Sequence, residues 1–234
     1  MFENARRFRY NSGMERIVVI GGGGHAKAVI DVLERQGRYE IAGYLDIHQP
    51  KGHRCLGYEN IDEKDDFRRV AKDLGARGGI IAVGDNAKRA HLAAAVRAVL
   101  PEFHFVTAVH PSAILGKHVV IGAGTVVMAG VVINPETRIG EHGIINTRAS
   151  LDHDNLIGSY VSIAPGVTTG GSVSVGDYSA VGLGANIIHG VAVGEHAVIG
   201  AGSTVIESIP AFVVAFGSPA KVQRSRKPGE DYLT

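Results

Sequence analysis

A period of six residues runs through the second half of the chain and limits the folds that this chain can adopt. Counting in sixes from Val109, sixteen of seventeen positions are aliphatic, and only Thr169 departs from the pattern. Neither the 3.6-residue period of an α-helix nor the two-residue period of a strand explains this spacing, whereas an internal repeat does. The repeat predicts a β-helix over residues 109–222, in which each hexad forms one short strand and a corner. The aliphatic positions, which should point inward, are Val109, Leu115, Ile121, Val127, Ile133, Ile139, Ile145, Leu151, Ile157, Ile163, Val175, Val181, Ile187, Val193, Ile199 and Val205.

The N-terminal part of the chain follows a different pattern. After Arg16 come an apolar strand, a glycine-rich turn, a helix and a second strand over residues 40–47, which together predict one βαβ unit of a parallel sheet. Further elements are expected as a polar helix over residues 62–75, a strand over 78–84, an Ala-rich helix over 86–100 and a short strand over 104–110. We therefore expect a small Rossmann-like α/β domain at residues 14–108. Residues 1–13 would form a loose extension before it, and residues 223–234 a tail after the β-helix.

Composition excludes several classes of function. Charged residues make up 20% of the 234 residues and the formal net charge is +1, so no nucleic-acid partner is expected. The single Cys55 excludes an internal disulfide and fits the reducing cytoplasm. The longest uncharged stretch, residues 155–176, is rich in Gly, Ser and Thr and is a poor membrane span. Residues 1–13 lack the apolar core of a signal peptide, so we expect a cytoplasmic protein without a membrane partner.

Three consecutive ionisable residues, Asp152, His153 and Asp154, interrupt the repeat. Leu151 is the inward position of its hexad, so His153 falls two residues later, near a corner where side chains can point outward. A histidine with a carboxylate beside it is a common general base, because the imidazole titrates near neutral pH and the carboxylate orients it and raises its basicity. The alternative is that the three residues form a solvated corner without a catalytic role.

The glycine loop Gly21–Ala26 follows a predicted strand and opens a predicted helix. It matches the pattern G-x-G-x-x-A, and Asp46 lies twenty residues beyond Ala26, which is the spacing of a dinucleotide-binding motif. Glycine lets backbone N–H groups approach a diphosphate, and the helix N-terminus supplies positive potential. The loop therefore indicates phosphate binding. It does not indicate NAD, because the domain is too small for a full dinucleotide fold and no dehydrogenase residues follow.

The stretch NTRASLDHDNLIGSYVSIAPGVTTGGSVSVG (146–176) and the ending GSPAKV (217–222) resemble the hexapeptide acyltransferase superfamily. Over residues ~16–222 the chain is similar to nucleotide-sugar acetyltransferases, namely the bacillosamine- and perosamine-type N-acetyltransferases of amino sugars and the sialic acid O-acetyltransferases. The resemblance implies a left-handed parallel β-helix with three hexads to a coil and between five and six coils. It also implies acetyl-CoA as co-substrate and a homotrimer whose active sites lie between subunits.

The same resemblance assigns roles to individual positions. His153 matches the catalytic base of the family, and Asp154 matches the acidic residue that tunes it. Ser162 stands where some relatives have a second histidine, so that its hydroxyl could donate to the thioester carbonyl. Other positions match coenzyme-contacting residues of the family: Gly171, Leu183, Ala201 and, for the coenzyme phosphates, Lys221.

Positions in the α/β domain match nucleotide-contacting residues of the family: Gly23, Gly24, His25 and Asp46, with Gly84 from the second turn GDNAKR (84–89). Arg89 could be a phosphate contact or an ordinary surface arginine. Gly217 and Pro219 could belong to the family's C-terminal motif or form a turn that leaves the β-helix.

The predicted function is that of an acetyl-CoA-dependent N-acetyltransferase acting on a nucleotide-linked amino sugar, such as a 4-amino-4,6-dideoxy sugar, with His153 as general base. An O-acetyltransferase of sialic acid or a related sugar is the alternative, and a non-catalytic nucleotide-sugar-binding scaffold is a third possibility. No covalent acyl-enzyme is expected, because Cys55 is far from His153 in sequence and the β-helix offers no obvious activated nucleophile.

A zinc enzyme like the gamma-class carbonic anhydrases is a weaker alternative. His189 lies 36 residues after His153, or two coils along the same corner, about 10 Å away at roughly 4.8 Å per coil. The third histidine of those enzymes would fall at Gly194, and His196 is out of phase with it. Catalytic zinc needs three protein ligands, so no metal is expected.

Overall fold

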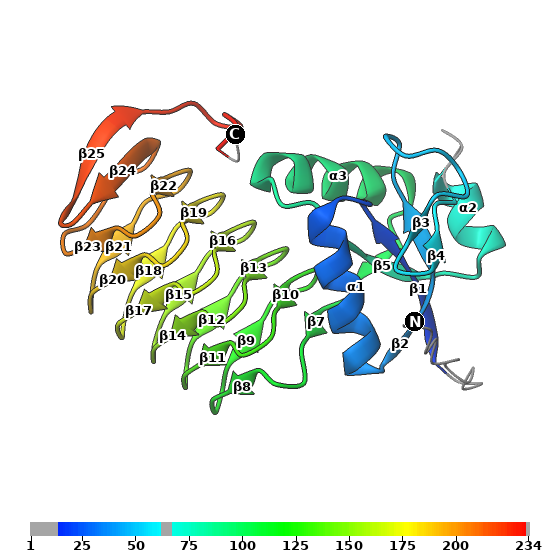
Figure 1. Cartoon of the computed structure of the whole chain (residues 1–234), viewed down its shortest axis with the longest axis horizontal. Helices are drawn as coiled ribbons and strands as arrows, with labels where there is room; N and C mark the ends of the chain where they lie inside the picture. The colour runs from blue at the N-terminus through cyan, green and yellow to red at the C-terminus, as the bar shows by residue number, and fades with distance from the viewer. Residues whose placement is uncertain (1–13, 62–66, 233–234) are drawn as a thin grey trace, which may run out of the picture.

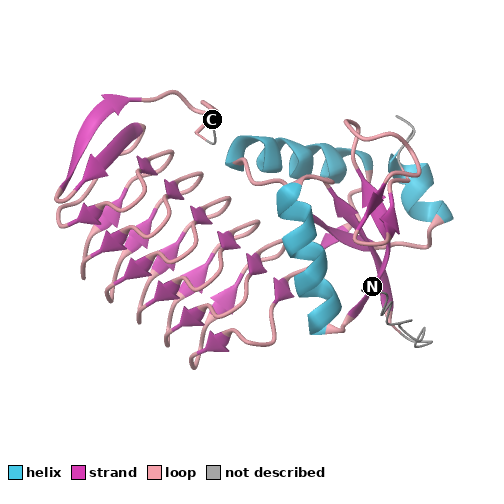
Figure 2. Cartoon of the chain, viewed as in Figure 1, coloured by secondary structure: helices cyan, strands magenta, loops and turns pink. Residues whose placement is uncertain are grey.

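A computed structural model describes residues 14–61 and 67–232 of the chain. Figure 1 shows an α/β domain at one end and a stack of regular coils extending from it, and Figure 2 shows that all three described helices belong to the α/β domain. The fold is therefore a small parallel-sheet domain followed by a left-handed parallel β-helix of about six turns, which confirms the predicted fold class.

The α/β domain is built on a four-stranded parallel sheet with the order β2-β1-β5-β6. Alternate residues of β1 point to opposite faces, so that Ile17 and Val19 pack against α1 whereas Val18 and Ile20 pack against α2 and α3. The elements are β1 (Glu15–Ile20), α1 (Gly24–Gln36), β2 (Tyr39–Leu45), β3 (Arg54–Cys55), β4 (Tyr58–Glu59), α2 (Phe67–Asp73), β5 (Gly78–Ile81), α3 (Asn86–Val99) and β6 (His104–Phe105). The sequence predicted β1, β2, β5 and the three helices; the start of the predicted polar helix at residues 62–66 lies outside the described residues. It did not predict the β3–β4 hairpin.

The β-helix has three parallel sheets whose strands pair with a register of eighteen residues, as in Ile145 with Ile163, so that three hexads make one coil. The first sheet contains β7 (Ala108–Val109), β10 (Val126–Val127), β13 (Ile144–Ile145), β16 (Ser162–Ile163), β19 (Ala180–Val181), β22 (Val198–Ile199) and β24 (Val213–Gly217). The second contains β8 (Ile114–Leu115), β11 (Val132–Ile133), β14 (Ser150–Leu151), β17 (Thr168–Thr169), β20 (Asn186–Ile187) and β23 (Thr204–Val205). The third contains β9 (Val120–Ile121), β12 (Arg138–Ile139), β15 (Leu156–Ile157), β18 (Ser174–Val175) and β21 (Ala192–Val193).

The second residue of each strand points into the prism, as the sixfold repeat predicted. From Val127 to Val205 all of these residues are buried and form one continuous core, whereas Leu115 of the first coil remains 43% exposed because no coil precedes it. Thr169, the one departure from the repeat, is also buried, and its hydroxyl accepts a hydrogen bond from the backbone N–H of Asp152 at 3.2 Å. The threonine that interrupts the aliphatic repeat therefore hydrogen-bonds to the backbone of the Asp152–Asp154 corner.

The two parts of the chain share a core. Ala108, Val126 and Ile144 face outward from the first sheet of the β-helix, yet they are buried in one cluster with residues of α1. The predicted strand over residues 104–110 is in fact two strands, because β6 completes the α/β sheet and β7 begins the β-helix. The chain passes directly from one sheet to the other, which fixes the α/β domain against the first coils.

The β-helix ends in an antiparallel hairpin of β24 and β25 (Ala220–Ser225). Gly217 and Pro219 lie at the turn of this hairpin, and β25 continues past residue 222, where the sequence placed the end of the β-helix. Beyond the hairpin the tail returns along the coils toward α3 (Figure 1).

Candidate active site

His153 lies at the corner between β14 and β15, outside the prism. Its Nδ1 pairs with Oδ2 of Asp154 at 2.7 Å, and the two side chains are 51% and 57% exposed. With the proton of Nδ1 donated to the carboxylate, Nε2 is left as a proton acceptor. The structure therefore gives the predicted base and carboxylate the contact that general-base catalysis needs.

Charges around this corner favour a basic imidazole. The hydrogen bond to Asp154 and the nearby charges of Asp152 and Asp154 raise the pKa of His153 above its ordinary value of 6.5. Asp152 has a separate role, because its Oδ1 accepts hydrogen bonds from Asn134 Nδ2 and from the backbone N–H of His153, both at 2.8 Å. These hydrogen bonds lower the pKa of Asp152, so this carboxylate stays ionised and ties the corner to the preceding coil.

Gly171 occupies the equivalent corner one coil further along, directly against the imidazole. A Cβ atom at Gly171 would lie only 2.5 Å from Cε1 and 2.6 Å from Nε2 of His153. The missing side chain makes room for the ring, and the exposed His189 of the next coil approaches it with a distance of 6.5 Å between the ring centroids. The two rings are closer than the 10 Å expected from coil spacing because nothing separates them at Gly171.

An open groove of about 840 Å³ lies along the third sheet of the β-helix. Leu156, which begins the strand after the His153 corner, lines it together with Arg138, Ser174, Ala192 and Ser208. Leu156 is 56% exposed. The His153 corner therefore borders a partly apolar surface.

The glycine loop forms the open N-terminus of α1. Gly23 is the N-cap residue and provides no side-chain cap, no acidic residue occupies the first turn, and a Cβ atom at Gly23 or Gly24 would meet nothing within 4 Å. The imidazole of His25 is half-buried, and burial followed by the charge of Arg89 lowers its pKa to about 4. The loop thus presents free space, helix-terminal N–H groups and a neutral imidazole, which suits an anionic ligand.

Asp46 shapes this loop. Its Oδ2 accepts a hydrogen bond from the Gly22 N–H at 2.7 Å, and its Oδ1 accepts one from the His48 N–H at 2.8 Å. A Cβ atom at Gly22 would come within 2.5 Å of the Tyr44 ring, so only glycine fits between this ring and Asp46. The predicted nucleotide contact therefore also fixes the conformation of the glycine loop.

Arg89 is neither the phosphate contact nor the surface arginine that the sequence left open. It is 1% exposed, which contradicts a surface position, and its guanidinium is used inside the protein. Nε donates to the His142 carbonyl, Nη1 to the carbonyls of Val83 and Gly84, and Nη2 to the Tyr160 carbonyl, all at 2.8–3.1 Å. Burial lowers the pKa of Arg89 to about 10. Arg89 therefore joins the α/β domain to the β-helix.

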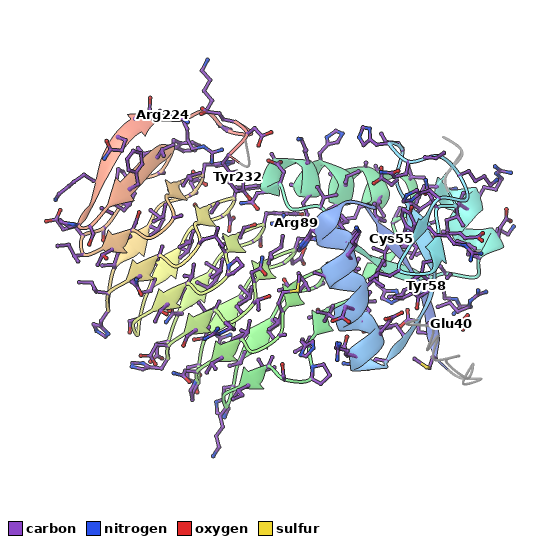
Figure 3. The ribbon with its side chains drawn as sticks, viewed as in Figure 1. Glu40, Cys55, Tyr58, Arg89, Arg224 and Tyr232 are labelled. Carbon is purple, nitrogen blue, oxygen red and sulfur yellow. The ribbon has the colours of Figure 1, made fainter. Side chains whose placement is uncertain are left out.

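Ser162 belongs to the same junction and not to the His153 corner of its own chain. Its Oγ donates to Asn86 Oδ1 at 2.6 Å, and this oxygen also accepts from Arg89 Nη2 and from the Tyr232 hydroxyl. Tyr232, in the C-terminal tail, reaches Gly84 as well, where its hydroxyl lies 3.3 Å from the carbonyl oxygen. Figure 3 shows Arg89 and Tyr232 at this junction between α3, the coils and the tail.

One chain does not bring the remaining predicted coenzyme positions to His153. Leu183, 58% exposed, and Ala201 lie at the corner between the first and second sheets, so the second sheet separates them from His153. Lys221 lies on β25, where its Nζ pairs with Glu207 at 3.3 Å. These placements divide the predicted site residues among two corners of the prism, the hairpin and the domain junction.

Three residues of this region were missed by sequence reasoning. Asn155 lies beneath His153, while Asn86 and Tyr232 lie at the domain junction. A polar residue four positions after the inward Leu151, where valine occurs in the next two coils, was a signal for Asn155. Tyr232 gave none, because its partners are 70 to 148 residues away.

Two classes of site are not found in the described part of the chain. Residues 14–61 and 67–232 contain no group of three or more His, Cys, Asp or Glu side chains placed to hold a metal ion. His196, from the zinc alternative, lies at a different corner from His153 and stacks on Tyr178 and Phe212. Over the same residues, no helix has the length and apolar character needed to cross a bilayer.

Comparisons with known proteins agree with this geometry. Residues 16–96 match the family model described as the PglD N-terminal domain. UDP-N-acetylbacillosamine N-acetyltransferase of Bacillus subtilis is 39% identical over 118 residues, which is 50% of this chain and 52% of the relative. GDP-perosamine N-acetyltransferase of Escherichia coli O157:H7 is 35% identical over 68 residues, 29% of this chain and 31% of the relative. The matched region thus spans about half or less of these curated relatives.

Solved structures match over nearly the whole chain. PerB of Caulobacter crescentus, in complex with CoA and GDP-perosamine, superposes with a TM-score of 0.82 at 37% identity, covering 89% of this chain and 97% of that one. The acetyltransferase domain of PglB from Neisseria gonorrhoeae, in complex with acetyl coenzyme A, gives a TM-score of 0.81 at 31% identity, covering 90% and 100%. The fold and the histidine corner define a hexapeptide-repeat acyltransferase. Within that class, the chain belongs to the family of bacillosamine- and perosamine-type nucleotide-sugar acetyltransferases.

Proposed function

We propose that this protein transfers an acetyl group from acetyl-CoA to the amine of a nucleotide-linked amino sugar, such as a 4-amino-4,6-dideoxy sugar, with His153 as general base. The observation that carries the proposal is the 2.7 Å contact between His153 Nδ1 and Asp154 Oδ2 at an exposed corner. The family membership and the relatives that bind CoA, acetyl-CoA and GDP-perosamine support these substrate classes.

The two parts of the chain divide the work in this proposal. The α/β domain, residues 14–108, binds the nucleotide diphosphate, with Gly23, Gly24 and His25 at the helix N-terminus and Asp46 and Gly84 beside them. The β-helix, residues 109–222, carries the chemistry and binds acetyl-CoA. The open helix N-terminus of α1 and the space above Gly23 and Gly24 support the first assignment.

His153 Nε2 accepts a proton from the sugar amine as the amine attacks the thioester carbonyl of acetyl-CoA. The carbon–nitrogen bond forms, the carbon–sulfur bond breaks, and CoA leaves as the thiol after protonation. Asp154 holds the imidazole with Nε2 free and stabilises the imidazolium that forms. Gly171, Leu183, Ala201, Ser162 and Lys221 are proposed to contact acetyl-CoA.

The division of these residues among different edges of one chain supports a homotrimer. In that arrangement the His153 corner of one subunit would face the Leu183–Ala201 corner of its neighbour, with acetyl-CoA between them. Such an assembly would also cover exposed apolar side chains such as Ile114, Leu156 and Ile188.

The purified protein should acetylate one member of a panel of UDP-, GDP- and dTDP-linked amino sugars. His153→Ala should lower turnover of that substrate by about 10²–10⁴-fold.

The pH dependence gives a second test. His153 acts as a base only when its imidazole is neutral, so kcat/KM should fall as pH falls. Because the pKa of His153 is raised, the midpoint of this acid limb should lie above 6.5. Asp154→Asn should move this midpoint down. Unchanged turnover in His153→Ala would remove His153 from the mechanism, and acetylation of free sialic acid alone would assign a hydroxyl acceptor.

A further inference from the structure

Asn155 is a buried amide directly beneath the corner that carries His153. It is the fourth residue of the corner, is 0% exposed and points into the prism. The equivalent positions of the next two coils are Val173 and Val191, which belong to the apolar core. A primary amide in this column therefore has a local cause, because burying a polar group is unfavourable unless hydrogen bonds compensate it.

The amide group of Asn155 binds the backbone of the corner from inside. Nδ2 donates to the carbonyl of Asp152 at 2.8 Å, to that of His153 at 3.2 Å and to that of Gly170 in the next coil at 3.0 Å. The Thr137 hydroxyl, one coil earlier, also donates to the Asp152 carbonyl, at 2.7 Å. The peptide groups on both sides of His153 are thus held by side chains from the interior.

These hydrogen bonds constrain the catalytic pair. Asp154 adopts a left-handed backbone conformation with φ of 58°, which is unfavourable for most residues with a side chain. Holding the carbonyls of Asp152 and His153 fixes the backbone torsions that lead into Asp154. Those torsions decide whether Oδ2 of Asp154 meets Nδ1 of His153.

Stability alone does not account for this amide. Asn155 Oδ1 is buried and has no hydrogen-bond partner among the described residues, which is a cost that valine would avoid. The part of the amide that forms hydrogen bonds is therefore Nδ2, which donates to backbone carbonyls around His153.

We propose that Asn155 is a positioning residue for the general base, holding the His153 corner so that the imidazole and the Asp154 carboxylate stay in register. The inference rests on the proposed function for its catalytic consequence, although the hydrogen bonds exist without it. Thr137 assists by holding the Asp152 carbonyl from the preceding coil.

The test uses an isosteric pair of variants in the full-length protein. Asn155→Val gives the corner the residue found in the next two coils, and Asn155→Thr restores one hydroxyl donor in the same volume. In Asn155→Val, kcat should fall about 10–100-fold while the KM values for acetyl-CoA and the sugar nucleotide stay within about twofold. Asn155→Thr should recover a large part of kcat.

A second measurement separates positioning from general loosening of the fold. The titration of the His153 ring, followed by NMR, should move to lower pH in Asn155→Val, because the hydrogen bond to Asp154 is the main cause of its raised pKa. The other titratable groups facing this ring are Asp152 and His189, and neither is replaced. Ser179→Ala is the matched control, since its buried hydroxyl binds the Gly194 carbonyl at another corner and its loss should leave the His153 titration unchanged.

The outcomes are distinct. An unchanged His153 titration in folded Asn155→Val, or equal shifts in Asn155→Val and Ser179→Ala, would overturn the inference. A third outcome separates the two proposals. If the titration shifts only in Asn155→Val, and the wild-type protein acetylates no amino sugar, the positioning of His153 is supported and the proposed function is rejected.

Discussion

At the scale of single residues, a buried imidazole makes the fold sensitive to acid. His142 is 0% exposed, neither ring nitrogen has a hydrogen-bond partner among the described residues, and the ring stacks on Tyr160. Burial, followed by the charge of Arg97, lowers the pKa of His142 to about 4. The unfolded chain therefore binds this proton first, so stability is full above pH 6.5 and is lost as pH falls from 6.5 toward 4.

His142→Phe should flatten this dependence. The change removes the titrating group and keeps an aromatic ring in the stacked column, and it should reduce the acid-induced loss of unfolding free energy by about 3 kcal/mol at pH 4. Urea unfolding at pH 7 and pH 4 measures the difference. Tyr178→Phe is the control, because it alters the same stacked column and leaves His142 in place. Equal pH dependence in wild type and His142→Phe would contradict the assignment.

Residue-scale prediction succeeded where the partners are neighbours in sequence and failed where they are not. His153 and Asp154 are adjacent, so their contact could be expected from the tripeptide Asp152–Asp154 and its position in the sixfold repeat. Arg89 could not be placed, because its acceptors on His142 and Tyr160 are 53 and 71 residues away. Only the folded junction shows that its guanidinium is buried.

At the scale of elements, the coil is a unit in which each corner touches the corner above it. Gly171→Ala should displace the His153 ring, since the new Cβ would lie 2.5 Å from its Cε1 atom. We expect kcat to fall about 10–100-fold with little change in thermal stability. Gly190→Ala, beside His189 in the next coil, would meet no atom within 4 Å and should keep kcat near the wild-type value, although its φ of 74° makes the new side chain costly to thermal stability. Steady-state kinetics and thermal unfolding of both variants test this, and an unchanged kcat in Gly171→Ala would be the contrary result.

The elements of the β-helix could be predicted almost completely, because a sixfold aliphatic repeat has one simple structural explanation. The ends of the repeat were harder to place. Residues 104–110 look like one apolar strand, but the chain uses them for β6 in one sheet and β7 in another. The β24–β25 hairpin also carries no hexad signal, since its strands pair antiparallel.

At the scale of the whole molecule, one buried cation holds the two parts together. Arg89→Met would leave the carbonyls of Val83, His142 and Tyr160 without the guanidinium that donates to them, and should lower the unfolding free energy by about 3–5 kcal/mol. Tyr232→Phe removes one hydroxyl from the same network and should cost about 1 kcal/mol. Chemical unfolding monitored by circular dichroism checks both values. A loss below 1 kcal/mol in Arg89→Met would show that the junction does not depend on it.

The hairpin of β24 and β25 has a consequence for solubility. A solenoid with an open end offers unpaired backbone to any similar molecule and invites end-to-end growth into fibres. Here the first sheet ends in β25, which runs antiparallel to β24 and so opposite to the strands of the coils. A second copy cannot continue the parallel ladder of the first sheet there, because it would meet a strand of reversed direction, so the hairpin blocks end-to-end growth along that sheet.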